Sequence, residues 1–546
     1  MTNTLISFKS LCALAMTFAA VVVWQPSVLA VPAGESRAAE SDAHVRVIAV
    51  DVDAVRGPLD TSFKECVGAG RANEGLRADW QDQLREVQRE CGFKYIRMHG
   101  LLTDDMGVYK EDAHGNPIYN WQYIDKLYDF LLSIDIKPLV ELSFMPDALA
   151  SGKRTIFWWK GNVTPPKSYA KWGDLIRHLV THFQERYGHD EVKTWFFEVW
   201  NEPDLHDAFW TGTKADYFKL YTVTAEAIKS VSPDYQVGGP ATAIGQWDES
   251  FINYCYTNHV PLDFVSTHTY GVKSGYLDAT GQRGTVIDSD PNSVIGRMVG
   301  EREMIDHSLM LNLPLYFTEW SSAYTPTDFM HDTYQQAAFI LSKVKGAYRS
   351  VNAMSYWTFT DIFEENGPRM RPFHGGFGMI NYEDLKKPAF YAFKFLNELG
   401  PTELVDTDLA SWVCKCPDGC VQTLFWNYTP DVPPEGMNDQ QFYDHIIPAK
   451  SIDPVVLRIT HLPAGSYSLK IYQTGYQVND VFTRYLEMGA PSQLTPIQVQ
   501  ILREQSNGDP NSVETIQVLP GQPFVRTFHM RQNDVFLVKL QPLDVR

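Results

Sequence analysis

The amino-acid sequence predicts an α/β protein: a (β/α)8 TIM barrel over residues 56–400, followed by a β-sandwich over residues 401–546. Two observations lead to this fold. Between residues 56 and 400, eight short apolar segments alternate with longer amphipathic segments. After Gly400, alternating runs such as 421–426, 455–459 and 466–472 are separated by turns rich in Gly, Pro, Asn and Asp. An open, doubly wound sheet is the alternative for the first part.

The eight predicted strands are short runs of apolar, aromatic and β-branched residues. They span residues 65–70, 95–100, 138–144, 195–202, 236–241, 264–271, 315–322 and 353–361. Apolar residues recur at intervals of three and four in residues 80–91, 121–134, 169–187, 216–231 and 332–348, and residues 387–399 close the series. Residues 68–70 (GAG) lack the third glycine of a dinucleotide-binding fingerprint, so they are not interpreted as one.

Residues 1–55 precede the barrel and show no strand–helix repeat. Residues 1–30 have the pattern of a secretory signal peptide, with Lys9 before an apolar run at 11–23 and a small-residue cleavage site at 28–30 (VLA). This predicts export to the periplasm or the medium, with a retained N-terminal anchor as the alternative. Residues 31–43 form a polar leader. The strand predicted at 45–52 is expected to pair with the β-sandwich, so that residues 31–55 join that domain.

Charge and composition indicate which classes of molecule the protein can bind. The net charge of −19 argues against nucleic acid or an anionic membrane as a partner. Aromatic residues make up 13% of the chain, and sugar-binding clefts use aromatic faces. Cys414, Cys416 and Cys420 do not have zinc-ligand spacing. The turn between Cys416 and Cys420 leaves open a disulfide in an oxidising compartment.

Two predicted strands end in a glutamate. The fourth runs through aromatic residues into Asn201, Glu202 and Pro203, and a proline cannot continue a β-ladder. The seventh ends in Glu319 in the same way. Because the strand ends of a parallel barrel meet at one face, the two carboxylates are expected to flank its mouth. Glycoside hydrolysis requires two such carboxylates, one as acid and one as nucleophile or base.

Further side chains are expected at the same face, after the second, sixth, seventh and eighth strands. They are His99, His268, Tyr270, Tyr324, Trp357, Glu364 and Glu365. Each has a structural alternative, such as a hydrogen-bonded histidine or a solvated carboxylate pair, and only their convergence favours a site. The spacing of His99, His268 and His374 supports no metal site.

The expected chemistry follows from these positions. Glu319 attacks the anomeric carbon, while Glu202, with a raised pKa, protonates the leaving oxygen and then activates water. Asn201 is placed to bind the sugar 2-hydroxyl, and Trp357 to stack on the ring. A carboxyl separation of about 5–5.5 Å predicts retention of configuration, and one of about 6.5–9.5 Å predicts inversion.

A set of short motifs resembles glycoside hydrolase family 39, in particular its β-xylosidases. The motifs are 63–71 (FKECVGAGR), 99–102 (HGLL), 160–166 (KGNVTPP), 197–203 (FEVWNEP), 318–320 (TEW), 356–365 (YWTFTDIFEE), 373–378 (FHGGFG) and 387–388 (KP). The resemblance covers roughly residues 45–400, and the β-rich tail more weakly. It implies a (β/α)8 barrel with an accessory β-sandwich, a retaining double displacement, and neither metal nor organic cofactor.

The resemblance also implies residue roles. By motif position, Glu202 is the acid/base and Glu319 the nucleophile. The implied sugar-subsite residues are His99, Asn201, His268, Tyr270, Tyr324, Trp357, Glu364 and Glu365. The implied partner is a glycoside or oligosaccharide from which an exo-acting β-xylosidase releases xylose. The sequence indicates no oligomeric state.

Two departures from the family pattern leave the sugar preference open. Trp320 follows the nucleophile, and Thr269 separates His268 from Tyr270; both are expected to border the sugar pocket. The alternatives are β-glucosidase and α-L-arabinosidase activity, or α-L-iduronidase activity with Arg369 or Arg371 binding the sugar carboxylate. A carbohydrate-binding protein without catalysis is the alternative from another class, but it need not keep both Glu202 and Glu319.

Overall fold

Eight parallel strands close a barrel in the computed structural model, which describes residues 45–273 and 284–543. In sequence order they are β3 (Cys66–Arg71), β4 (Tyr95–His99), β7 (Lys137–Glu141), β10 (Phe196–Glu198), β11 (Gln236–Thr242), β12 (Phe264–Tyr270), β15 (Leu315–Ser321) and β16 (Ala353–Tyr356). Each pairs in parallel with its sequence neighbours, and β16 closes on β3. The predicted (β/α)8 barrel is therefore confirmed.

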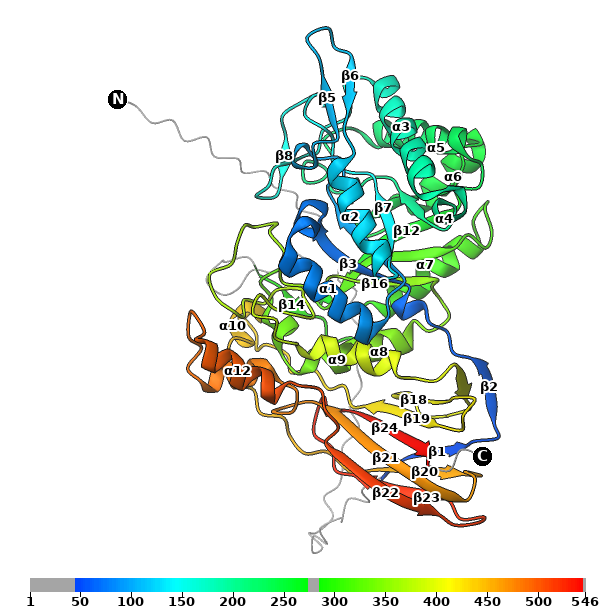
Figure 1. Cartoon of the computed structure of the whole chain (residues 1–546), viewed down its shortest axis with the longest axis vertical. Coiled ribbons are helices and arrows are strands. Elements are labelled where there is room, and N and C mark those ends of the chain that lie inside the picture. Colours follow the sequence, from blue (N-terminus) through cyan, green and yellow to red (C-terminus); the bar gives the residue numbers. More distant parts are fainter. Residues whose placement is uncertain (1–44, 274–283, 544–546) are drawn as a thin grey trace, which may run out of the picture. The chain divides into compact units, whose positions relative to one another are not determined.

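Helices cover the outside of this barrel (Figure 1). They are α1 (Ala78–Cys91), α2 (Gln122–Ser133), α3 (Tyr169–Tyr187), α4 (His189–Val192), α5 (Lys214–Val231), α6 (Asp248–Asn258), α7 (Ile295–Asp306), α8 (Gln335–Gly346) and α9 (Pro388–Asn397). The helical pattern has a clear local cause in α1, where Trp80, Leu84, Val87 and Cys91 are buried at intervals of four and three. None of the described helices is long and apolar enough to cross a membrane.

The loops between these elements contain short pieces of regular structure. Three antiparallel pairs are β5 (Tyr109–Glu111) with β6 (Pro117–Tyr119), β8 (Thr155–Ile156) with β9 (Gly161–Asn162), and β13 (Val272–Lys273) with β14 (Val286–Ile287). The 3-10 turns are η1 (Ser62–Lys64), η2 (Ala72–Leu76), η3 (Asp104–Met106) and η4 (Phe329–Asp332).

Three strands end three or more residues before the predicted end. The fourth ends at Glu198 rather than Glu202, the eighth ends at Tyr356 rather than at residue 361, and the third ends at Glu141 rather than at residue 144. In the first case the backbone leaves the extended region, with φ of 74° at Trp200 and 44° at Glu202. The Glu202 N–H still donates to the Ala241 carbonyl at 2.8 Å. Glu202 therefore lies on an irregular turn that remains attached to β11, not on a strand end.

Two further sheets consist mainly of strands that follow the barrel in the sequence. One has the order β2 (Val55–Pro58), β17 (Thr402–Leu404), β18 (Ser411–Lys415), β19 (Val421–Trp426), β24 (Val535–Pro542), β21 (Gly465–Thr474) and β22 (Ser512–Val518). The other has the order β1 (Arg46–Asp51), β20 (Val455–Thr460) and β23 (Phe524–Phe528). Three helices belong to the same region: α10 (Asp439–Phe442), α11 (Val481–Glu487) and α12 (Pro496–Gln505).

The two sheets share one hydrophobic core, as a sandwich does. Across it, the rings of Phe425 on β19 and Phe528 on β23 lie 5.1 Å apart. The strand β1 pairs in parallel with β20, and β2 pairs with β17, so the start of the described chain belongs to these sheets. Residues 1–44, including the expected signal peptide, lie outside the described residues.

The sequence left open a disulfide between Cys416 and Cys420, and this disulfide is not formed. Both are free thiols, and the side-chain amide of Gln422 donates to their sulfurs at 3.2 and 3.0 Å. The β-hairpin thus brings both sulfurs next to one side-chain amide, that of Gln422, which hydrogen-bonds to each of them.

Candidate active site

Arg97 is the centre of the charged network inside the barrel. Its fully buried guanidinium donates to Glu198 Oε2 at 2.5 Å, to Glu319 Oε1 at 2.7 Å and to Asn201 Oδ1 at 2.8 Å. The same group lies 2.9 Å from Glu141 Oε2. One cation thereby links β4, β7, β10 and β15. Because side chains alternate along a strand, Arg97 and His99 both face the interior of the barrel.

Glu319 accepts hydrogen bonds on both carboxylate oxygens. Arg97 binds Oε1, and the Tyr270 hydroxyl donates to Oε2 at 2.7 Å. His99 Nε2 lies 3.5 Å from Oε1. Burial, followed by the charges of Glu319 and Glu202, raises the pKa of Tyr270 well above its usual range, so its hydroxyl keeps the proton that it donates. These donors hold Glu319 in one orientation.

Glu202 lies in a different electrostatic environment. Its Oε1 is 2.9 Å from His268 Nδ1, and only 8% of the residue is exposed. Burial raises the pKa of Glu202 well above its usual range, and the charges of Glu319 and Asp204 raise it further. Burial likewise lowers the pKa of His268 well below its usual range, which leaves a neutral imidazole. The pocket therefore favours a protonated Glu202.

The hydrogen bonds of Thr318 indicate where that proton lies. The single hydroxyl hydrogen of Thr318 goes to Glu198 Oε1 at 2.7 Å, and Glu198 is ion-paired with Arg97. The Thr318 oxygen, 3.2 Å from His268 Nε2, must then accept a hydrogen from that nitrogen. Neutral His268 is left with a lone pair on Nδ1, which accepts from a protonated Glu202. The hydrogen bonds therefore all run in one direction: Glu202 donates to His268, His268 donates to Thr318, and Thr318 donates to Glu198.

A cavity of about 830 Å³ opens over these groups. Nine of the ten predicted site residues line it: His99, Asn201, Glu202, His268, Tyr270, Glu319, Tyr324, Trp357 and Glu365. Glu365 lies 3.7 Å from His99 Nε2, and burial followed by the charge of Glu319 raises its pKa well above the usual range. The Trp357 ring packs over Gly68, where a Cβ would lie 2.3 Å from the indole, so this position requires glycine.

Two of the sequence expectations are wrong, and a third is confirmed. Glu364 does not line the cavity, because its carboxylate is held by Arg77 at 2.9 Å and Arg71 at 3.3 Å. Trp320 does not border it either; its buried ring packs against Tyr356. Thr269 lines the cavity, as expected.

Sequence reasoning missed Arg97, Glu141 and Glu198. A signal was available, because each is a charged residue inside an otherwise apolar predicted strand, and Arg97 lies two residues before His99. A charge at such a position needs a buried partner. The partner itself could not be named, since Arg97 and Glu319 are 222 residues apart in the sequence.

One group of side chains in the pocket has the atom types of metal ligands. Within the described part of the pocket, Glu202, His268 and Glu319 offer ligand-type atoms within 4.8 Å of one another. The Arg97 guanidinium already lies 2.7 Å from Glu319 and supplies the positive charge at this point, so a divalent cation there would meet like charge. His374 does not line the pocket.

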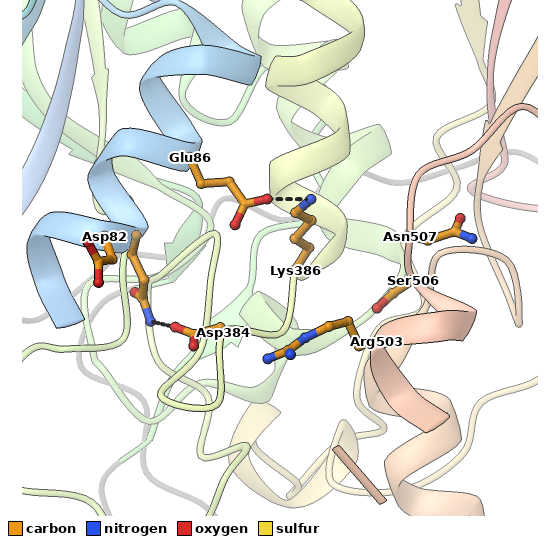
Figure 2. A pocket seen from close by; sticks show the side chains of 8 residues that line it. Asp82, Glu86, Asp384, Lys386, Arg503, Ser506 and Asn507 are labelled. Atoms are coloured by element: carbon orange, nitrogen blue, oxygen red, sulfur yellow. Dashed lines mark hydrogen bonds and ion pairs between the residues drawn. The ribbon is translucent and has the colours of Figure 1, made fainter. Parts of the chain in front are cut away.

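A second hollow, of about 460 Å³, lies outside the barrel between α1, residues 384–386 and α12 (Figure 2). Two pairs of its polar side chains bind each other: Lys386 lies 2.7 Å from Glu86, and the Gln83 amide donates to Asp384 at 2.9 Å. No predicted site residue lines this hollow. The candidate chemistry lies in the barrel mouth.

Comparison with known proteins agrees with this geometry. The family model described as "Glycosyl hydrolases family 39" matches residues 46–516. The chain belongs to glycoside hydrolase family 39. A β-xylosidase of Geobacillus stearothermophilus is 44% identical over 378 residues, covering 68% of this chain and 75% of that protein.

Two solved structures resemble this family 39 chain over most of its length. A monomeric β-xylosidase from Caulobacter crescentus CB15 has a TM-score of 0.88 at 42% identity, covering 91% of this chain and 100% of the other. A GH39 enzyme from Xanthomonas axonopodis pv. citri has a TM-score of 0.89 at 40% identity, covering 93% and 99%.

Proposed function

We propose that this family 39 glycoside hydrolase is a retaining, exo-acting β-xylosidase that releases xylose from β-xylosides or xylo-oligosaccharides. The observation that carries the proposal is the pairing of Glu202 with Glu319, whose nearest oxygens lie within 4.8 Å of each other. Retaining glycosidases hold their carboxyl groups about 5–5.5 Å apart, whereas inverting enzymes need about 6.5–9.5 Å to admit a water.

In this mechanism Glu319 attacks the anomeric carbon. Arg97 and Tyr270 orient its two oxygens for that attack. Glu202 gives its proton to the glycosidic oxygen as the bond breaks, and the resulting carboxylate then takes a proton from the water that releases the sugar. The oxygen of Asn201 is occupied by Arg97, so its amide NH2 group is the part that can donate to the sugar 2-hydroxyl.

Xylose is the proposed sugar because the relatives of high identity are named β-xylosidases. β-Glucosidase and α-L-arabinosidase activities stay as alternatives within the family. The α-L-iduronidase alternative needs a free cation for the sugar carboxylate. Among the described lining residues the single Arg or Lys is Arg297, which Glu301 binds at 2.7 Å and Asp248 at 3.2 Å. Arg369 and Arg371 do not line the pocket, and Arg371 pairs with Asp444.

The test follows the hydrolysis of an aryl β-D-xyloside by proton NMR. We expect β-xylose to appear first and to mutarotate later. If α-xylose appears first, the reaction inverts configuration and Glu319 acts as a base on water. If no xylose appears while an aryl glucoside or arabinoside is cleaved, the two-carboxylate mechanism stands and the sugar assignment is wrong.

The proposal includes export. Its support is the signal-peptide pattern of residues 1–30. Intact-mass measurement of the protein from its native host should give a mature chain that begins after Ala30, in the periplasm or the medium. A chain that retains residues 1–30 at the membrane would instead indicate the anchored alternative.

A further inference from the structure

One rim of the pocket consists of apolar side chains. Five of them line the cavity from three loops: Ile156, Phe157, Leu205, Phe209 and Ile244. All are partly or well exposed, and Ile244 is 56% exposed. A single exposed apolar residue needs no explanation, but several that converge on one cavity mark a surface that excludes water. We call these five residues the apolar rim.

Contacts between the loops hold the apolar rim together. The rings of Phe157 and Phe209 meet edge to face at 5.5 Å. Arg154, on the loop of Phe157, donates to the Asp207 carbonyl at 3.0 Å. Asp204 Oδ1 accepts from the Ala243 N–H at 2.8 Å, which ties the loop of Ile244 to the loop of Leu205. These contacts fix the three loops relative to one another, so the apolar rim is an ordered surface.

The apolar rim lies on the Glu202 side of the site. The Leu205 N–H donates to the Glu202 carbonyl at 3.1 Å, and the Phe209 N–H donates to the Leu205 carbonyl at 3.0 Å. Leu205 and Phe209 thus continue the turn that carries Glu202. Because Glu202 is the proposed proton donor to the leaving oxygen, the leaving group must lie on this side of the pocket.

We propose that the apolar rim is the leaving-group subsite and that it takes an aromatic aglycone in preference to a second sugar; this inference rests on the proposed function. A second pyranose brings hydroxyl groups that lose water on binding, and the five side chains have no donor or acceptor to replace it. A phenyl ring only replaces water at apolar surface. Cleavage then breaks the glycosidic C–O bond, the Glu202 proton goes to the phenolic oxygen, and water supplies the hydroxyl of the free sugar.

Polar side chains line the cavity as well and provide the contrasting case. They are Asp288, Asn292, Ser293 and Arg297, and the Arg297 guanidinium lies beside Gly245, the neighbour of Ile244. A second sugar held by these polar groups would not depend on the apolar side chains. The two possibilities therefore differ in which substitutions change the affinity for which ligand.

The test measures binding to the wild-type enzyme by calorimetry, with two probes that resist hydrolysis: phenyl 1-thio-β-D-xyloside and S-linked xylobiose. We expect the phenyl probe to bind about tenfold more tightly. Ile244→Gln should reduce this ratio about threefold or more, and Ile244→Phe should increase it. Ile118→Gln is the matched control, because Ile118 is 52% exposed on β6 and does not line the pocket.

Equal or tighter binding of S-linked xylobiose overturns the inference. So does a ratio that Ile244→Gln and Ile244→Phe leave unchanged. If neither xyloside binds, the sugar assignment of the proposed function has failed. The same pair of probes built on glucose and on L-arabinose then decides whether the apolar rim selects the phenyl group.

Discussion

Two fully buried cations in the described part of the barrel, Arg97 and Lys387, each face more than one carboxylate. Arg97 contacts Glu141, Glu198 and Glu319. Lys387 lies 2.7 Å from Asp332 and 3.1 Å from Asp361. Both clusters are nearly inaccessible to solvent, so exposure alone does not distinguish a reactive cluster from a structural one.

The partners of the carboxylates distinguish them. Around Lys387 the other hydrogen bonds are made with the backbone. The Lys387 ammonium donates to the Gly376 carbonyl at 2.8 Å. Asp332 accepts from the Gly375 N–H and Asp361 from the Gly378 N–H, at 2.7 Å each. This cluster is closed, and it holds the 373–378 motif in place. The Arg97 cluster instead includes Glu319, which lines the cavity. A buried charge network can therefore act chemically where one of its members reaches open space.

The largest expected effect is at Glu319. Glu319→Ala should reduce kcat on an aryl β-xyloside on the order of 10⁴-fold or more, because the nucleophile is lost. The melting temperature should change little, because the buried Arg97 guanidinium still has two carboxylate partners, Glu141 and Glu198. Steady-state kinetics and calorimetry on the same preparation check both. A near-wild-type rate would contradict the assignment of the nucleophile.

The next effect is at Glu202. Glu202→Ala should lower the rate about 10²–10⁴-fold on an alkyl xyloside, whose leaving oxygen needs a proton. The loss should be smallest on 4-nitrophenyl xyloside, whose leaving group departs as the anion. The readout is the dependence of rate on leaving-group pKa, which should become steeper. An equal loss on all leaving groups would remove Glu202 from the acid role.

Lys387 should affect stability rather than chemistry. Lys387→Met leaves Asp332 and Asp361 without their cation and should lower the free energy of unfolding by about 3–5 kcal/mol. Lys386→Met is the control: this neighbour pairs with Glu86 at the surface of the fold, and its loss should cost about 1 kcal/mol or less. Denaturant titration measures both. Equal losses in the free energy of unfolding for the two variants would contradict the structural role of the Lys387 cluster.

The smallest expected effect is a shift in pH dependence. Thr318→Val removes the hydroxyl between His268 and Glu198, so His268 can carry its proton on Nδ1 and donate to the Glu202 carboxylate. This lowers the pKa of Glu202. Because the reaction needs protonated Glu202, activity is lost as pH rises through that pKa, and the alkaline limb of kcat/KM should move to lower pH. Thr318→Ser should restore the limb; an unmoved limb in Thr318→Val argues against the hydrogen-bond direction.

Local pattern predicted the barrel well because each strand and helix buries one face at its own period. The same local rules failed at the fourth and eighth strands, which were predicted to extend to residues 202 and 361. Aromatic residues favour a strand through Trp200, but the turn there follows from contacts with β11, as in the bond from the Glu202 N–H to Ala241.

Residue type and spacing were enough to predict the order of the barrel elements and the two glutamates, because strand order and side-chain alternation depend on them. Which charged residues contact one another became evident from the fold alone. Adjacent Glu364 and Glu365 were indistinguishable in sequence, yet the first is bound by Arg71 and Arg77 and the second lines the cavity. The physical reason is that a buried charge is placed by its partner, and here the partners lie hundreds of residues away in the chain.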